Sequence, residues 1–485
     1  MRRSPIVPAL GLLLSLAACR GTDAPQRRPD STPAPSGGDV SPLVERYQPT
    51  ADRIIDAVLS GNGAWGKLEA LCDGIGHRLS GSKGMEEAVE WAAATMAADG
   101  HEAVRKEPVQ VPHWVRGEES LHMLAPEALA LPILGLGGSV GTPPEGITAE
   151  VAVVADEAVL EALGERAKGR IVLFNNPMPA YTPEEGHGYG KTVRFRVGGA
   201  DLASAKGAVA VLVRSVTAHS LRTPHTGMLR YKGEQAKIPA AAVTIEDAAL
   251  IARLSAAGKV VEVTLRMGAK DLGEAPSANV VGELRGTELP DEIVVIGGHL
   301  DSWDTGQGAH DDGGGCVAAM EALTVLRKLG LRPRRTIRVV LWTNEENGLA
   351  GAKAYAKAHE AELAKHVAAI ESDMGVFAPI GYGVDLEDDS KEKEVAARVE
   401  GLLPLLARLG PQSVETGFGG ADVSPMKPAG VPTMGLRVDV AKYFDYHHSP
   451  ADTLDKVDPD ELSRCVASLA VMSFVLADMP GRLVD

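Results

Sequence analysis

The spacing of apolar residues divides the chain into regions that predict different elements. Between residues 50 and 100 the apolar positions recur at helical spacing, most clearly where Met85, Val89 and Met96 follow Ser82, a residue type that caps helix starts. A strand is expected after this region, near residues 104–111. The start of the folded chain is therefore predicted to be helical.

From residue 125 onward the pattern changes to short strands rich in valine and alanine, such as AEVAVVAD and GRIVLF, separated by glycine- and proline-rich loops. After Asn279 apolar strands alternate with amphipathic helices. This alternation predicts an α/β fold with a mostly parallel central sheet flanked by helices on both faces. We assign residues 49–124 and 269–485 to this domain and residues 125–268 to an inserted β-rich domain.

The amino terminus reads as an export signal. Two arginines precede an apolar run over residues 6–18 that is too short to span a bilayer comfortably. The run ends in Leu-Ala-Ala-Cys, which resembles a bacterial lipobox, so residues 1–19 are predicted to be a signal peptide and Cys19 a lipidated residue. An ordinary cleavage site beside an incidental cysteine is the alternative. Residues 20–48, rich in Pro, Ser, Gly and charge, are expected to form a flexible tether.

These features predict an exported lipoprotein anchored to a membrane. Arg20 after the cysteine would allow sorting to the outer membrane, while the periplasm and the cell surface stay open. The length of 485 residues favours two folded domains, and the net charge of −16, with no basic stripe, argues against a nucleic-acid partner. Three further cysteines, Cys72, Cys316 and Cys465, are an odd number for an oxidising compartment. One disulfide is an option, but buried free thiols are the commoner case in helices.

Polar residues cluster where the predicted strands end, and ligands of open α/β sheets bind at that side. Imidazole and carboxylate groups without cysteine favour a catalytic metal site over a structural one, and with two metals one carboxylate must bridge. Any one of these residues alone could be a cap or a surface charge, as Asp312 could cap the next helix. Their joint occurrence favours the metal site. The cluster consists of His299, Asp301, Asp311, Glu345, Glu346, Asp373, His447 and His448.

The motifs GGHLDSWDTGQGAHDDGGG, WTNEENGLAGAKAYA, ESDMG and YHHSPADT occur in the order seen in a known family. The chain resembles the two-zinc exopeptidases of the aminopeptidase Y and glutamate carboxypeptidase type, and within them the carboxypeptidase Q group and its bacterial relatives. The likeness runs from about residue 50 to the end and includes GHRLSGSKGMEEAVEWAAATM and SLRTPHTGM. It implies that the insert is a protease-associated domain, which shapes or covers the active site, and that the protein is a homodimer.

The resemblance also implies roles for single residues. Asp311 would bridge two zinc ions, although other divalent metals are acceptable to such a site. Asp301 would accept a hydrogen bond from the imidazole of His299, and Glu345 would be the general base for a metal-activated water. Relatives commonly carry an oxyanion-stabilising tyrosine where this chain has His447, so the oxyanion donor stays open. The implied zinc ligands are His299, Asp311, Glu346, Asp373 and His448.

The expected function is that of a zinc-dependent exopeptidase acting on dipeptides or short peptides, as in the carboxypeptidase Q group. A broad aminopeptidase that releases N-terminal residues is the alternative, and the sequence does not decide between them. A receptor-like binding protein on the same fold would be expected to have broken ligands, whereas all are present here. Weaker candidates are His310 and Asp304 in the metal loop, His225 in the insert, for which a loop hydrogen bond is favoured, His113 and Trp114 at the domain junction, and Asp422.

Overall fold

The computed structural model describes residues 41–484. The predicted signal peptide, Cys19 and the tether up to residue 40 lie outside the described residues. The tether was predicted to reach residue 48, but helix α1 (Ser41–Ser60) already includes this stretch. Its first turns are held in place because Tyr47 is buried and donates a hydrogen bond to Asp478 (2.9 Å). Within residues 41–484, no helix has the length and apolar character needed to cross a membrane.

The first sheet has eight strands in the order β1-β10-β12-β11-β13-β16-β14-β15. Its central strands β12, β11, β13 and β16 are parallel. The pairs β1–β10, β10–β12 and β14–β16 are antiparallel, and the edge strand β15 is parallel to β14. The sheet is therefore mixed, with a parallel centre, and not mostly parallel throughout. The strands are β1 (Glu102–Val115), β10 (Lys270–Leu284), β11 (Leu289–His299), β12 (Arg335–Trp342), β13 (His366–Glu371), β14 (Pro379–Asp385), β15 (Ser413–Thr416) and β16 (Thr433–Val438).

Helices cover both faces of this sheet, as the alternation in sequence predicted. Along β11, Val294 and Ile296 belong to the core formed with α1, α8 and α12, while Ile293 and Val295 belong to the opposite core with α9. Such alternation follows from the two-residue period of a strand. The helices are α2 (Ala64–Cys72), α3 (Lys83–Ala98), α8 (Gly314–Lys328), α9 (Ala350–Ala358), α10 (Asp389–Leu402), α11 (Tyr443–Tyr446) and α12 (Pro459–Asp478).

Helix α3 matches the expectation from sequence, because the hydroxyl of Ser82 accepts a hydrogen bond from the backbone N–H of Met85 (3.2 Å). The three cysteines within the described residues are free and buried. Their interpretation as buried thiols is confirmed for Cys316 and Cys465, and it extends to Cys72.

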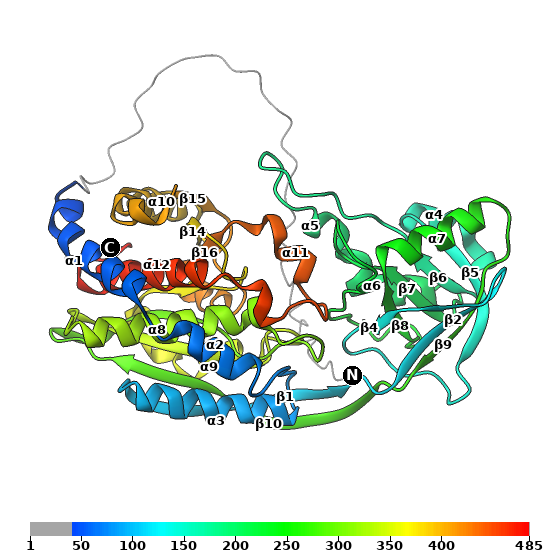
Figure 1. Ribbon diagram of the computed structural model, residues 1–485, viewed down its shortest axis with the longest axis horizontal. Coiled ribbons are helices and arrows are strands. Elements are labelled where there is room, and N and C mark those ends of the chain that lie inside the picture. The colour runs from blue at the N-terminus through cyan, green and yellow to red at the C-terminus, as the bar shows by residue number, and fades with distance from the viewer. Residues whose placement is uncertain (1–40, 485) are drawn as a thin grey trace, which may run out of the picture.

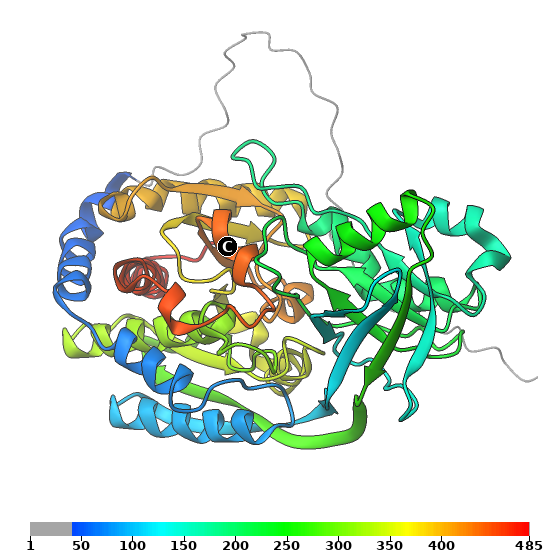
Figure 2. The same cartoon turned by 45° about the vertical axis from the view of Figure 1, so that its right-hand side comes forward.

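A second eight-stranded sheet is formed by the residues between β1 and β10, which we call the insert (residues 116–269). The long β1–β10 pair carries the chain from one sheet to the other and back, along the lower edge in both views (Figures 1 and 2). The insert sheet begins at Glu119, before the predicted boundary at 125, because β2 pairs with β9. Its elements are β2 (Glu119–Ala125), β3 (Leu129–Leu131), β4 (Ile133–Gly135), β5 (Ile147–Val154), α4 (Glu157–Leu163), β6 (Ile171–Phe174), α5 (Tyr189–Thr192), α6 (Arg194–Ser204), β7 (Ala210–Arg214), β8 (Ala240–Val243), α7 (Ile245–Ala256) and β9 (Glu262–Met267).

The two sheets meet through a small apolar cluster. Trp114 at the end of β1 packs there with Leu79, Ala269 and Trp303, and its indole N–H donates to the carbonyl of Ser139 (2.9 Å). Trp114 therefore lies at the junction between the sheets, as the sequence suggested, and this contact positions the insert next to the loop that follows β11.

Candidate active site

Three neighbouring parallel strands, β12, β11 and β13, deliver the predicted polar residues to one edge of the first sheet. His299 is the last residue of β11, Glu345 and Glu346 follow β12, and Asp373 follows β13. Parallel strands end at the same edge, which is why residues far apart in sequence meet. Asp311 comes from the turn that leads into α8, and His448 from the loop after α11.

The five potential metal-binding residues form two groups that share one carboxylate. In the first group, Nε2 of His299 lies 3.3 Å from Oδ1 of Asp311 and 3.2 Å from Oδ1 of Asp373. In the second, Nε2 of His448 lies 3.4 Å from Oδ2 of Asp311 and 3.0 Å from Oε2 of Glu346. The two oxygens of Asp311 thus face different groups, as a bridging carboxylate requires.

Both His447 and His448 lie close enough to Asp311 to be the histidine of the second group. Their rings are stacked at 3.5 Å, and Nε2 of His447 also faces Asp311, at 3.9 Å. The ring of His448 is nearer, and it alone of the two contacts Glu346. His448 has a φ of +59°, an unusual conformation for a residue with a side chain. The geometry favours His448 as the metal-binding imidazole and leaves His447 beside it.

The carboxylate of Asp301 was expected to accept a hydrogen bond from the imidazole of His299, but the structure shows a different contact. The imidazole Nδ1–H of His299 donates to the backbone carbonyl of Asp301 (2.9 Å), and the carboxylate is farther away, at 3.7 Å. The carboxylate instead accepts from the backbone N–H groups of Glu345 (3.0 Å) and Glu346 (3.3 Å). Backbone direction explains the difference, because the turn after β11 brings the carbonyl under the ring while the side chain reaches the turn after β12.

Asp311 is held by its neighbours on both sides. The carboxylate of Asp452 accepts from the backbone N–H groups of His310 (2.8 Å) and Asp311 (3.1 Å). The carboxylate of Asp312 accepts from the backbone N–H of Gly315 in the first turn of α8 (3.1 Å), the capping contact considered from sequence, and also from the backbone N–H of His299 (3.0 Å). Asp312 therefore ties the end of β11 to the start of α8.

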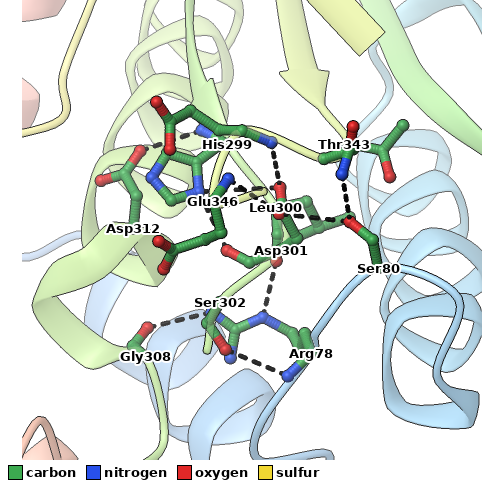
Figure 3. Close-up of polar contacts among 12 residues, drawn as sticks. Arg78, Ser80, His299, Leu300, Asp301, Ser302, Gly308, Asp312, Thr343 and Glu346 are labelled. Atoms are coloured by element: carbon green, nitrogen blue, oxygen red, sulfur yellow. Dashed lines mark hydrogen bonds and ion pairs between the residues drawn. The ribbon is translucent and has the colours of Figure 1, made fainter. Parts of the chain in front are cut away.

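Arg78 supports the same loop, and the sequence analysis missed it. Its side chain is fully buried and donates to the backbone carbonyls of Leu300 (2.7 Å) and Gly308 (3.0 Å), as Figure 3 shows. It also donates to the carbonyls of Gly76 (2.8 Å) and Gln307 (2.7 Å). The available signal was an arginine within the motif GHRLSG, although nothing in that spacing indicates carbonyl acceptors.

The electrostatics of the site fit a bound cation. Burial, together with the charges of Asp311 and Glu345, raises the pKa of Glu346 well above its usual range. Burial, together with Asp373 and Asp301, raises the pKa of Glu345 to about 8 against the opposing effect of His299. Oδ2 of Asp311 is buried without a hydrogen-bond partner. Such a concentration of buried carboxylates is costly unless cations offset their charge.

The histidines fit the same interpretation. Burial, reinforced by His447, lowers the pKa of His448 well below its ordinary value. The imidazole is then neutral near pH 7, as a metal ligand must be. With its Nε2 facing the carboxylates, the Nδ1–H of His448 points to the backbone carbonyl of Thr226, at 3.4 Å. An outer acceptor of this kind orients metal-binding histidines and fixes their tautomer.

The insert holds the histidine loop directly. The backbone N–H of Thr226 donates to the carbonyl of His448 (2.9 Å), and Nδ1 of His225 contacts the carbonyl of His447 (2.8 Å). Burial lowers the pKa of His225 to about 4, so its ring is neutral and Nδ1–H is the donor. The favoured interpretation of His225 as a loop hydrogen bond is confirmed, and the loop concerned is that of the site.

The remaining candidates lie around the site without entering it. The carboxylate of Asp304 pairs with Arg116 (2.9 Å from Nε), and the ring of His310 stacks on Phe377 at 4.2 Å. The backbone N–H of Asp422 donates to Glu371 (2.9 Å). None of these side chains belongs to the two groups built around Asp311.

The family model described as Peptidase family M28 matches residues 279–473. The chain is 42% identical to carboxypeptidase Q of Mus musculus over 448 residues, which cover 92% of this chain and 93% of that protein. A peptidase M28 precursor from Shewanella amazonensis SB2B has a crystal structure with a TM-score of 0.85 at 38% identity, covering 90% of this chain and 98% of that one. A zinc aminopeptidase from Bacillus subtilis shares the fold, with a TM-score of 0.62 at 21% identity, over 87% and 96% of the two chains.

Proposed function

The chain belongs to peptidase family M28 and is a zinc-dependent exopeptidase, and we propose that it hydrolyses free dipeptides at a site that holds two zinc ions. The observation that carries the proposal is the pair of groups that share Asp311, one on each carboxylate oxygen. The name carboxypeptidase Q, borne by relatives aligned over nine-tenths of the chain, supports action on substrates with a free carboxyl end. The proposed ligands are His299, Asp311 and Asp373 for one ion and Asp311, Glu346 and His448 for the other.

Glu345 is proposed as the general base. Within residues 41–484 its carboxyl group has no hydrogen-bond or ion-pair partner, while its backbone N–H is fixed by Asp301. When bound, zinc supplies Lewis-acid chemistry that acidifies water and polarises a carbonyl group. Glu345 accepts the proton of the attacking water as the new C–O bond forms, and it then returns this proton to the leaving amine nitrogen as the peptide C–N bond breaks.

His447 is proposed to donate a hydrogen bond to the oxygen of the scissile carbonyl. Burial, with the neighbouring charge of Arg196, lowers the pKa of His447 well below its ordinary value, so the ring is neutral and carries one N–H. A neutral donor at a fixed position stabilises developing negative charge without costing a proton transfer. The family resemblance implies a tyrosine at this position in many relatives, and a tyrosine hydroxyl is also a neutral donor.

The insert is proposed to be a protease-associated domain, and the mature protein an exported homodimer anchored to a membrane through Cys19. The export proposal rests on the leader sequence, and the domain and dimer proposals rest on the family resemblance. Replacing Cys19 with serine should release the protein from the membrane fraction, and light scattering on purified protein should give twice the subunit mass.

The decisive experiment is hydrolysis by protein that starts at Asp39, with free dipeptides, carboxyl-amidated dipeptides and aminoacyl anilides, before and after chelation and zinc restoration. Chelator-sensitive cleavage confined to free dipeptides would support the proposal. Cleavage of amidated substrates and anilides as well would identify a broad aminopeptidase. Absence of zinc-restored cleavage with every substrate would contradict the proposed substrate class.

A further inference from the structure

A second arginine, Arg196, reaches the candidate active site from the insert. It lies on α6, and only 6% of its surface is exposed. One terminal nitrogen, Nη1, lies 3.3 Å from Nδ1 of His448, and the other, Nη2, donates to the hydroxyl of Tyr189 (2.7 Å). Tyr189 begins α5, which packs against α11 through a ring contact with Phe444 at 4.9 Å (Figure 1).

The guanidinium of Arg196 has no anionic partner in the part of the chain that the structure describes. No carboxylate of residues 41–484 forms an ion pair with it, and its Nε is buried without a hydrogen-bond partner. The contact with Nδ1 of His448 does not satisfy Nη1, because that nitrogen carries a proton when Nε2 faces the carboxylates. Among residues 41–484 the only other acceptor for Nη1 is the carbonyl of Thr226, at 3.5 Å.

Such an arrangement is costly without a ligand. A buried guanidinium that lacks a counter-charge loses several kcal/mol of solvation, and buried polar groups in folded proteins nearly always have partners. The position is nevertheless built into the fold. Cζ of Arg196 lies 2.5 Å from where a Cβ of residue 227 would be, so a side chain there would displace the guanidinium, and the φ of Gly227, +133°, is one that residues with side chains rarely adopt.

We propose that Arg196, together with the hydroxyl of Tyr189, binds the α-carboxylate of a dipeptide substrate. This inference rests on the proposed function and names the residues that would restrict it to substrates with a free carboxyl end. Arginine presents paired N–H groups that match both oxygens of a carboxylate. The tyrosine hydroxyl accepts from Arg196 and has no acceptor for its own proton within residues 41–484, so it is a further donor.

The place of Arg196 suits the length of a dipeptide. The terminal carboxylate carbon lies about 4 Å beyond the scissile carbon, because only the amide nitrogen and one Cα separate them. A carboxylate-binding group must therefore adjoin the metal-binding residues. Arg196 contacts His448, which is itself 3.0 Å from Glu346, so it lies one side chain away from them. A peptide with a third residue would carry its carboxylate beyond this point.

The test compares free dipeptides with their carboxyl amides on wild-type protein and on Arg196→Gln. We expect wild type to favour the free form by at least 100-fold in kcat/KM, since hydrogen bonds to charged groups are worth about 1.5–3 kcal/mol each. In Arg196→Gln, hydrolysis of the free form should fall about 100-fold and that of the amide by less than threefold. Arg196→Lys should recover part of the preference. Arg194→Gln, an exposed arginine two residues away on the same helix, is the matched control and should behave as wild type.

A binding measurement separates recognition from catalysis. In the Glu345→Gln background, calorimetry should show at least tenfold weaker binding of the free dipeptide once Arg196 is replaced, with unchanged binding of the amide. Zinc content should be the same in both proteins. An equal loss for free and amidated substrates, or a loss of zinc, would overturn the proposal and leave Arg196 as a residue that positions His448. Equal hydrolysis of both substrates by wild type would overturn it, together with the restriction to free dipeptides, while leaving the zinc exopeptidase activity intact. Hydrolysis of neither substrate would count against the proposed function itself.

Discussion

The two halves of the candidate site are built from different parts of the molecule. His299, Glu346 and Asp373 stand at the ends of adjacent parallel strands and are fixed by contacts within the first sheet and its loops. His447 and His448 lie on a loop whose backbone carbonyls are bound by His225 and Thr226 of the insert. One half is therefore anchored by the central sheet, and the other by a unit that lies elsewhere in the sequence.

The insert therefore takes part in positioning the metal-binding histidine. It donates hydrogen bonds to the backbone that carries His448 and brings Arg196 against the same ring. The first sheet supplies the carboxylates, which any two-zinc site requires, whereas the insert is placed to decide which substrate ends fit. If Arg196 binds the substrate carboxylate as proposed, chemistry and substrate selection are divided between the two sheets, and each part can be tested with its own variants.

The largest loss of zinc and of activity is expected on replacing Asp311, the residue shared by the two metal-binding groups. Asp311→Asn removes the negative charge on which both metal groups depend, so zinc per subunit should fall from two to nearly none and hydrolysis should be lost. Asp373→Asn affects the first group alone and should leave about one zinc ion, since the second group keeps its three ligands. Mass spectrometric metal analysis on dialysed protein measures both. Equal zinc content in the two variants would contradict a shared carboxylate.

Glu345→Gln should lower kcat by between about 10² and 10⁴, because the general base is lost, while zinc content stays at the wild-type level. Glu346→Gln, the neighbouring substitution of the same type, should instead lower zinc content. Comparing the two variants therefore distinguishes the general base, Glu345, from its neighbour Glu346, which binds the metal. Near-normal turnover in Glu345→Gln would refute its assignment.

Two variants compare the hydrogen bonds that hold the metal-binding residues in place, one made by the insert and one made within the first sheet. His225→Ala removes the donor to the carbonyl of His447, and Asp301→Ala removes the acceptor for the turn that carries Glu346. Outer contacts of this kind typically change metal affinity by about 10- to 100-fold. Zinc titration against a competing chelator should show such a loss in both, and His225→Asn, which keeps a donor near Nδ1, should recover most of it. Wild-type affinity in His225→Ala would mean that the insert does not support the metal-binding loop.

The same division explains what the sequence could predict. The strand-end residues were found because apolar runs mark where β11, β12 and β13 end, and that edge is where an open sheet binds ligands. Arg196 and Tyr189 gave no such signal, since their approach to the site depends on how the insert packs against α11. The contact made by Asp301 was assigned to the wrong oxygen because spacing does not reveal backbone direction. The tether ended earlier than predicted because Tyr47 finds a partner, Asp478, at the far end of the chain.

The smallest predicted effect concerns the pH dependence of stability, and it arises from a histidine that lies away from the metal site. His101 is buried against Thr324, and burial lowers its pKa to about 4, against an opposing effect of Asp99. The unfolded chain, with a histidine pKa near 6.5, binds more protons between these values, so the free energy of unfolding must fall as pH drops through this window. From pH 7 to pH 5 this residue accounts for a loss of about 2 kcal/mol. His101→Gln should show a correspondingly shallower pH dependence in urea unfolding, whereas His219→Gln, an exposed histidine of the insert, should follow wild type. An unchanged slope in His101→Gln would mean that this ring is already protonated in the folded protein at pH 5.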